Sequence, residues 1–228
     1  MLFAMSPNDD RIKASPKAEG YCSYLKCRLI PKCGKINIWH WSYPKGINNP
    51  HYEPETEWHL GMKEWLADLF NYPDGVEKFF NRERRTDFNI GNICIELQKS
   101  SIDIREVVAR NNFYNKIGIK VLWIFYFDNK ISTFGCNPSE MERLGYFNIS
   151  NLRYNFNRSH YIFTVSHPKR FLKNLRPKRN KYLLFFNSRD DYPQKLFFDI
   201  KWTNQSAKYM TGNILTKDEL VNLITRNK

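Results

Sequence analysis

The spacing of apolar residues predicts two helices and a strand in the middle of this 228-residue chain. From Glu57 to Phe70, apolar side chains recur every three or four residues, which is the period of one face of an α-helix. Residues 102–116 show the same helical spacing. Residues 119–127 are almost continuously apolar, as is typical of a strand covered on both faces. A short strand is also expected near residues 76–80.

The segment 84–98, between the two predicted helices, has the pattern of a β-hairpin. Gly91-Asn92 favours a two-residue turn, and a turn of that length fixes which residues of the two strands face each other. Residues two positions apart in a strand lie on the same face of a sheet. The hairpin therefore predicts that Asp87 lies directly across from Glu96.

Two carboxylates placed this close on one sheet face repel each other. A fold can keep them there by protonating one, by leaving both in water, or by placing a cation between them. The last solution predicts a site for Mg²⁺ or Mn²⁺, which prefer oxygen ligands. The alternative is an exposed hairpin with a solvated polar face. Arg85 is expected across from Gln98 on this face, where it either contacts a phosphate or neutralises the acids.

The order of strand, hairpin, helix and strand predicts an α/β fold. A helix that connects two parallel strands forms a crossover, so the hairpin belongs to a larger mixed β-sheet flanked by helices. Further strands are expected at 161–165, 182–186 and 195–200, with a helix at 216–224. We divide the chain into an N-terminal β-unit with a loosely structured start (1–50), a core (51–136), and a basic, β-rich C-terminal extension (137–228).

The order of these motifs resembles the PD-(D/E)xK nuclease superfamily, in which an acid on one strand and an E-x-K or E-x-Q sequence on the next hold a metal ion. It is also similar to the nuclease-like region of the CoiA competence protein family. This similarity covers about residues 57 to 128 and rests on 57–59, Lys63, 84–87, 95–102, Arg110, Tyr114, 118–119 and 122–124. It implies a restriction-endonuclease-like core and metal-dependent hydrolysis of DNA, near DNA uptake or recombination or in a phage or defence context.

The resemblance matches Asp87, Glu96, Gln98 and His59 to residues of the family's site, and Lys63 is our own addition. Asp87 and Glu96 match the metal ligands, and Gln98 takes the E-x-Q position, where it would orient the attacking water. A neutral amide lacks the positive charge of the commoner lysine, so Lys63 on the preceding helix is our candidate for that charge. The alternative for Lys63 is an ordinary half-buried lysine. His59 matches a helix histidine of RecB-like members, and its alternative is a side chain bonded to a neighbour.

Charge is unevenly distributed along the chain. The formal net charge of +13 divides into +5 for residues 1–50, −3 for residues 51–128 and +11 for residues 129–228. Basic flanks around an acidic core fit a polyanionic partner such as DNA. The densest basic run, for which the alternative is a solvated loop, contains Lys169, Arg170, Lys173, Arg176, Lys178 and Arg179.

Cysteines near the N-terminus raise a second metal-site hypothesis. Zinc needs four nitrogen or sulfur ligands, which Cys22, Cys27, Cys33 and His40 could supply. Their spacing departs from the C-x-x-C pattern of CoiA-like proteins, so the alternative is free thiols in a small β-unit. Five cysteines in a basic chain do not indicate disulfides.

Composition narrows the class of protein. With 42% apolar and 16% aromatic residues, the chain is expected to fold into a globule. No apolar run reaches the ~18 residues of a membrane span and the start lacks a signal sequence, so we expect a soluble, cytoplasmic protein. Two alternatives to a nuclease stay open: a catalytically inactive nuclease fold that binds nucleic acid, and a protein whose basic surface meets an acidic partner. The strandedness of the DNA is not decided.

Overall fold

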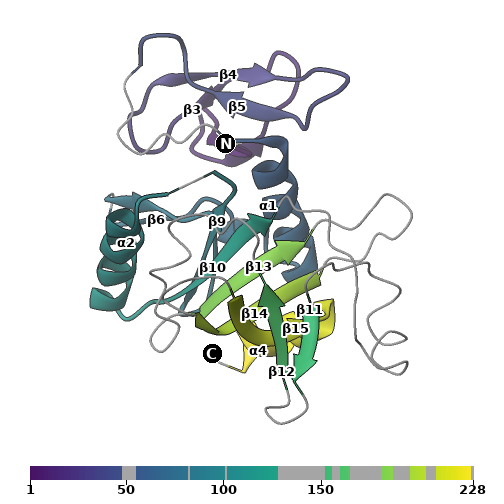
Figure 1. Ribbon diagram of the computed structural model, residues 1–228. Coiled ribbons are helices and arrows are strands. Elements are labelled where there is room, and N and C mark those ends of the chain that lie inside the picture. The colour runs from purple at the N-terminus through teal and green to yellow at the C-terminus, as the bar shows by residue number, and fades with distance from the viewer. Residues whose placement is uncertain are drawn as a thin grey trace. The chain divides into compact units, whose positions relative to one another are not determined.

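The computed structural model describes residues 1–47, 55–81, 83–100, 102–127, 152–155, 160–164, 181–186, 196–203 and 209–226. The chain forms two compact units, Met1–Ile90 and Gly91–Lys228. Both units combine helices with β-strands, so the predicted α/β class is confirmed (Figure 1). The observed division falls at residue 90, whereas the segments 1–50, 51–136 and 137–228 remain a prediction from the sequence.

A five-stranded antiparallel sheet begins the first unit, in the order β2-β1-β3-β4-β5. Its strands are β1 (Phe3–Met5), β2 (Arg11–Lys13), β3 (Gly20–Tyr21), β4 (Arg28–Lys32) and β5 (His40–Ser42). The expectation that the first 20 residues are loosely structured is therefore wrong. Strands of two or three residues are too short to show an alternating pattern, and the polar residues around them obscured the strands.

The inner face of this sheet forms a small core around Trp41. The core consists of Met1, Ala4, Ala14, Cys22, Leu29 and Trp41. Gly20 makes this packing possible, because a Cβ atom there would lie 2.6 Å from the Trp41 ring and 2.8 Å from the Ala4 Cβ. Any larger residue at position 20 would push the indole out of the core.

Helix α1 (Glu57–Phe70) has the bounds that the apolar spacing predicted. It begins after Thr56 and ends at Asn71, whose φ of 46° is typical of a helix C-cap. Its inward face buries four apolar residues and one charged residue: Leu60, Met62, Leu66, Ala67 and Lys63. The 3₁₀-helix η1 (Pro73–Gly75) follows.

The chain then forms a two-stranded sheet of β6 (Phe79–Phe80) and β7 (Arg84–Arg85), and β8 (Phe88–Ile90) ends the first unit. Arg85 lies opposite Phe79, so its predicted place in one continuous hairpin strand across from Gln98 is wrong. The backbone hydrogen bonds Thr86 N–H to Lys78 C=O and Glu77 N–H to Asp87 C=O explain the difference. They tie this segment to the one before it and separate β7 from β8.

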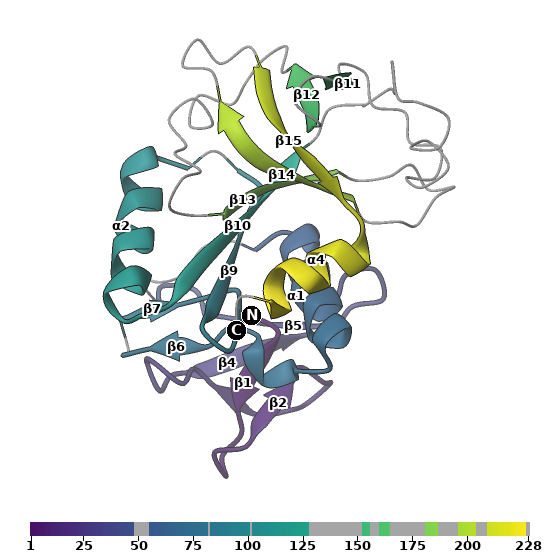
Figure 2. The same ribbon diagram turned by 90° about the horizontal axis from the view of Figure 1, so that it is seen from below.

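The second unit begins with the predicted strand, helix and strand. These are β9 (Ile93–Gln98), α2 (Ile104–Lys116) and β10 (Lys120–Phe127). β9 and β10 run parallel, with Glu96 next to Trp123, so α2 forms the expected crossover. Figure 2 shows α2 alongside these strands.

The C-terminal region extends the same sheet. β13 (Lys181–Phe186) pairs in parallel with β10, and four antiparallel strands continue from it: β14 (Leu196–Thr203), β15 (Tyr209–Leu215), β12 (His160–Thr164) and β11 (Leu152–Asn155). Helix α4 (Lys217–Thr225) closes the unit. The three strands and the helix predicted here are confirmed, whereas β11 and β15 were not predicted.

Candidate active-site residues

Lys63 is the centre of a buried ionic cluster in the first unit. Its side chain is fully buried, and its Nζ lies 3.0 Å from Glu55 Oε2, 3.1 Å from Glu77 Oε1 and 3.0 Å from Asp87 Oδ1. The position follows from the helix, because Lys63 falls on the face of α1 that the apolar residues turn inward. The lysine thus neutralises part of the charge of three carboxylates.

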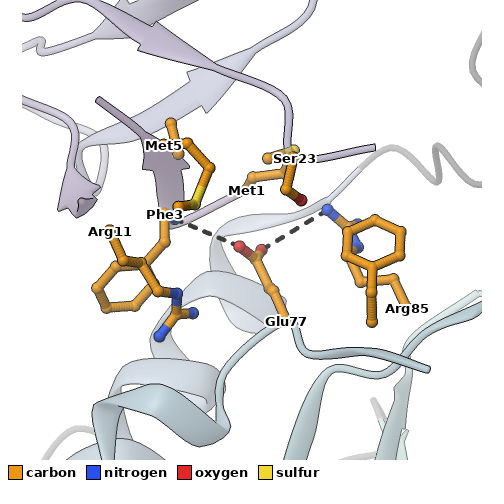
Figure 3. Close-up of a pocket in the computed structure, with 9 residues that line it drawn as sticks. Met1, Phe3, Met5, Arg11, Ser23, Glu77 and Arg85 are labelled. Carbon is orange, nitrogen blue, oxygen red and sulfur yellow. Dashed lines mark hydrogen bonds and ion pairs between the residues drawn. The ribbon is translucent and has the colours of Figure 1, made fainter. Parts of the chain in front are cut away.

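Arg85 supplies a second cation to this cluster. Its guanidinium lies 2.9 Å from Glu55 Oε1 and 4.0 Å from Glu77 Oε1. The Met1 amino group lies 3.6 Å from Glu55 Oε2. Figure 3 shows the Glu77 carboxylate between Arg85 and the β1 strand. The arrangement supports the reading of Arg85 as a residue that neutralises acids, while its proposed contact with a phosphate stays a prediction.

Glu77 is held in an unusual backbone conformation. Its φ of 53° lies in the left-handed region, which non-glycine residues adopt rarely. Its carboxylate accepts hydrogen bonds from the backbone N–H groups of Leu2 and Phe3. The neighbouring cavity has a volume of about 40 Å³, which is room for a few water molecules. Glu77 therefore serves the internal structure of this unit.

The cluster shifts the ionisation of its members strongly. Burial alone would raise the pKa of Glu55 and of Glu77, but the Lys63 and Arg85 charges outweigh it and hold both values below the ordinary one. Burial alone would lower the pKa of Lys63, but the three carboxylates raise it above its ordinary value. Lys63 is therefore a permanent cation and cannot act as a general base near neutral pH.

His59 lies in the first turn of α1, where it takes part in a helix cap. Its Nδ1 accepts a hydrogen bond from the Thr56 backbone N–H at 3.3 Å and lies 3.0 Å from the Thr56 hydroxyl. The ring also contacts Trp58 edge-on, with 5.0 Å between ring centroids. The alternative expected for His59, a side chain bonded to a neighbour, matches these contacts, and a catalytic role stays a prediction.

Glu96 is the centre of a second cluster, in the second unit. Only 1% of its surface is exposed, and its carboxylate accepts hydrogen bonds from Arg110 Nη1 at 2.7 Å and from the Tyr114 hydroxyl at 2.8 Å. Both donors lie four residues apart on α2, on the same side of the helix. The Arg110 Nε also pairs with Glu106 at 2.9 Å. Helix α2 thus fixes the position of the Glu96 carboxylate.

The surroundings of Glu96 keep the Tyr114 hydroxyl protonated. Burial raises the pKa of Tyr114, and the Glu96 charge raises it further, so the phenol remains a hydrogen-bond donor. The next layer is also polar: Asn111 accepts a 2.8 Å hydrogen bond from the Trp123 indole, and Trp123 is the neighbour of Glu96 on β10. A carboxylate held this rigidly is prepared for the role of a metal ligand.

Gln98 lies two residues after Glu96 on the same strand and is 6% exposed. Its Nε2 donates to the Ser100 carbonyl at 3.0 Å and lies 3.1 Å from the Ser100 hydroxyl. These contacts orient the amide. They use its nitrogen, so the amide oxygen is the atom suited to accept a hydrogen bond from a water molecule.

Asp87 and Glu96 belong to different units. Gly91 and Asn92 lie between β8 and β9, and Gly91 has a φ of 56°, so the predicted turn residues are confirmed. The facing of the two carboxylates stays a prediction. Carboxylate and amide oxygens are ligand types that a hard divalent cation prefers, and 17% of the Asp87 side chain remains exposed.

Three of the four proposed zinc ligands share one region, because Cys27 and Cys33 pack against the core that contains Cys22. Cys22 lies in the core of the five-stranded sheet, 3.0 Å from the Tyr43 hydroxyl, and the His40 Nδ1 lies 2.8 Å from the Ile38 carbonyl. Among the residues that the structure describes, no three His, Cys, Asp or Glu side chains are grouped so that they could hold a metal ion. Zinc binding by Cys22, Cys27, Cys33 and His40 thus has no geometric support.

The sequence did not indicate that Glu55 and Glu77 belong to the cluster around Lys63. Glu55 lies two residues before α1, and Glu77 lies in a loop, so neither belongs to a periodic pattern. The basic run proposed to bind nucleic acid lies outside the described residues: Lys169, Arg170, Lys173, Arg176, Lys178 and Arg179.

Among the residues that the structure describes, none of the helices has the length and apolar character of a membrane span.

A comparison with known families identifies the chain. The family described as competence protein CoiA, nuclease-like domain, matches residues 55–216. The chain belongs to this CoiA nuclease-like family. The match begins at Glu55 and contains Lys63, Glu96 and their side-chain partners, whereas all five strands β1–β5 precede it. No curated protein and no solved structure matches the chain.

Proposed function

We propose that this member of the CoiA nuclease-like family is a Mg²⁺- or Mn²⁺-dependent nuclease that hydrolyses phosphodiester bonds of DNA. The observation that carries the proposal is the Glu96 carboxylate, which Arg110 and Tyr114 fix on the strand that also carries Gln98. A rigid buried acid followed two residues later by an oriented amide has the chemistry that a metal-dependent hydrolase needs.

Each residue of the proposed site has a distinct task. Asp87 and Glu96 hold the cation, which when bound activates water and stabilises the charge that develops on the phosphate. Gln98 accepts a hydrogen bond from the attacking water and orients it. Lys63 acts through Asp87: it is fully buried, so it positions the carboxylate and has no access to the substrate.

The neutral side chain of Gln98 leaves the site without the charge that a lysine would supply. The basic residues around the core are the proposed source of positive charge for the phosphates of DNA. Cys22, Cys27 and Cys33 are reduced thiols, which agrees with a reducing compartment, so we place the activity inside the cell.

A second candidate function is nucleic-acid binding without catalysis. One observation favours it: Arg110 and Tyr114 already satisfy the Glu96 carboxylate, so the acid does not need a cation in order to be stable in the interior. In that case the protein would bind DNA through its basic residues and leave it intact.

Incubation of the purified protein with labelled linear and closed circular DNA, each with and without Mn²⁺, separates the two candidates. We expect cleavage only with the metal and its loss on addition of EDTA. Cleavage of the closed circle would establish endonuclease action. Binding of both substrates without cleavage would refute the nuclease and leave the binding protein.

A further inference from the structure

One face of the strand pair β4–β5 is exposed and basic. Along β4, Arg28, Ile30 and Lys32 are exposed while Leu29 between them is buried in the core. Lys32 lies directly across from His40, so these two side chains share the outer face of the sheet. The outer face thus carries three residues that are basic or can become so, next to an exposed Ile30.

The loop between β4 and β5 adds exposed apolar side chains. Trp39 is 46% exposed and Ile36 is 95% exposed. The Trp39 indole is nevertheless held in place, because its N–H donates to the Gly34 carbonyl at 2.9 Å. That bond places the ring next to the Gly34 backbone. The exposed part of the indole is therefore a fixed, flat and apolar surface.

The charged side chains of residues 28–47 are all basic, while Glu57 from helix α1 accepts a hydrogen bond from the Ile38 N–H at 3.3 Å. Residues 28–47 contain four basic residues, Arg28, Lys32, Lys35 and Lys45, and no Asp or Glu. Arg28 pairs with Glu19 at 2.9 Å, whereas both partners remain largely exposed. A basic surface attracts phosphates, but that attraction alone does not account for exposed Trp39 and Ile36. Unpaired bases do account for them, since every base has an apolar face that stacks on an aromatic ring.

We propose that residues 28–47 form a binding surface for single-stranded DNA. Trp39 stacks on a base, and Lys32 and Lys35 contact the neighbouring phosphates. The choice of DNA rests on the proposed function. The surface itself does not, because it precedes the segment 55–216 that matches the CoiA nuclease-like family. It gives the protein a way to hold an unpaired strand that is separate from the residues proposed for hydrolysis.

The test is the binding of a labelled oligothymidylate to the full-length protein in EDTA, where metal-dependent cleavage cannot interfere. We expect Trp39→Ala to weaken binding about ten-fold, because one base loses its stacking partner. Trp39→Phe keeps an aromatic face and should retain most of the affinity. Binding should also quench tryptophan fluorescence in the wild type more than in Trp39→Phe.

The lysines are tested by the salt dependence of the same binding. The logarithm of the binding constant falls linearly with the logarithm of the salt concentration. For single strands, each lost phosphate contact reduces the magnitude of this slope by roughly 0.7, so the double variant Lys32→Gln with Lys35→Gln should reduce it by about twice that amount. The matched control is Lys116→Gln with Lys217→Gln, which removes the same charge from exposed positions in the second unit. We expect the control to bind the oligonucleotide like the wild type.

Several outcomes overturn the proposal. Wild-type affinity in Trp39→Ala, equal losses in the lysine pair and its control, or equal losses for duplex and single-stranded DNA would each exclude this surface. A protein that binds the oligonucleotide through Trp39 but cleaves no DNA would refute the nuclease and leave this proposal standing. Metal-dependent cleavage together with wild-type binding in Trp39→Ala would support the nuclease and refute the single-strand surface.

Discussion

The Lys63 ammonium lies 3.0 Å from the Asp87 carboxylate in the interior of the first unit. Asp87 is the acid on which the proposed metal site depends, and Lys63 is the residue that holds it in place. Because Lys63 also contacts Glu55 and Glu77, the position of the proposed ligand is tied to the stability of the whole unit. Changes in this cluster should therefore affect folding as well as catalysis.

Replacement of the central cation should be strongly destabilising. Lys63→Met keeps most of the side-chain volume but leaves three buried carboxylates without their shared partner, so we expect the free energy of unfolding to fall by about 3–5 kcal/mol. Urea denaturation followed by circular dichroism measures this loss.

The matched control for that variant is Lys13→Met. Lys13 pairs with Glu64 at 3.1 Å, but its side chain is 59% exposed, so the loss should stay below about 1 kcal/mol. Equal losses in the two variants would mean that the buried cluster contributes no more than a surface ion pair.

The cluster also predicts that the protein loses stability in acid. The charges of Lys63 and Arg85 hold the pKa of Glu55 and Glu77 below the ordinary value in the folded state. A depressed pKa contributes stability that is complete above the unfolded pKa of about 4.3 and is lost as the pH falls through the lower folded value. Urea midpoints measured from neutral pH downward should therefore begin to fall below about pH 4.3.

The variant Glu77→Gln tests the same cause. It removes one of the titrating carboxylates, so its midpoint should start lower at neutral pH and fall less steeply in acid than that of the wild type. A midpoint that falls equally steeply in both proteins would show that other groups cause the acid sensitivity.

The hydroxyl of Tyr114 should matter for cleavage through Glu96. It donates a 2.8 Å hydrogen bond to the carboxylate, and hydrogen bonds to charged groups contribute about 1.5–3 kcal/mol. If that positioning is lost in the transition state, Tyr114→Phe should cleave DNA at least about ten-fold more slowly. Steady-state cleavage rates at saturating Mn²⁺ measure the effect.

Glu106→Gln is the control for the Tyr114 variant. It removes the other partner of Arg110 but keeps both donors on Glu96, so its cleavage rate should remain near that of the wild type. A rate in Tyr114→Phe as high as in Glu106→Gln would mean that the hydroxyl does not position Glu96.

The oriented amide of Gln98 should be needed for the chemical step. Gln98→Ala removes the group that we propose to orient the attacking water, and we expect a roughly 10²-fold lower cleavage rate. Binding of DNA, measured by fluorescence anisotropy with Ca²⁺ in place of Mn²⁺, should be unchanged. Weaker binding with an unchanged rate constant would instead make Gln98 a binding residue.

The elements that the sequence predicted correctly are those with local patterns. The stripe of apolar residues from Glu57 to Phe70 predicts α1 from local spacing, with no information from the rest of the chain. The order of β9, α2 and β10 follows from the hydrophobic periodicity and from the rule that a helix connecting two parallel strands makes a right-handed crossover. Arg110 and Tyr114 share a side of α2 because they lie four residues apart, and the structure adds that both reach Glu96.

The contacts that the sequence did not predict join segments far apart in the chain. Glu77 meets Lys63 and the backbone of Leu2, and no local pattern links a loop to a helix and to the first strand. The break after Arg85 also has a nonlocal cause, since β7 pairs with β6 in preference to continuing into β8. The alternation of polar and apolar residues in 84–90 is compatible both with one continuous strand and with two short strands.

The central claim is that Asp87 and Glu96 together hold the catalytic cation. The most direct test compares Mn²⁺-dependent cleavage of labelled DNA by the wild type, Asp87→Asn, Glu96→Gln and the surface control Glu64→Gln, each checked for folding by circular dichroism. We predict that Asp87→Asn and Glu96→Gln each lose cleavage while the control retains it. Wild-type cleavage in either folded variant would contradict the claim.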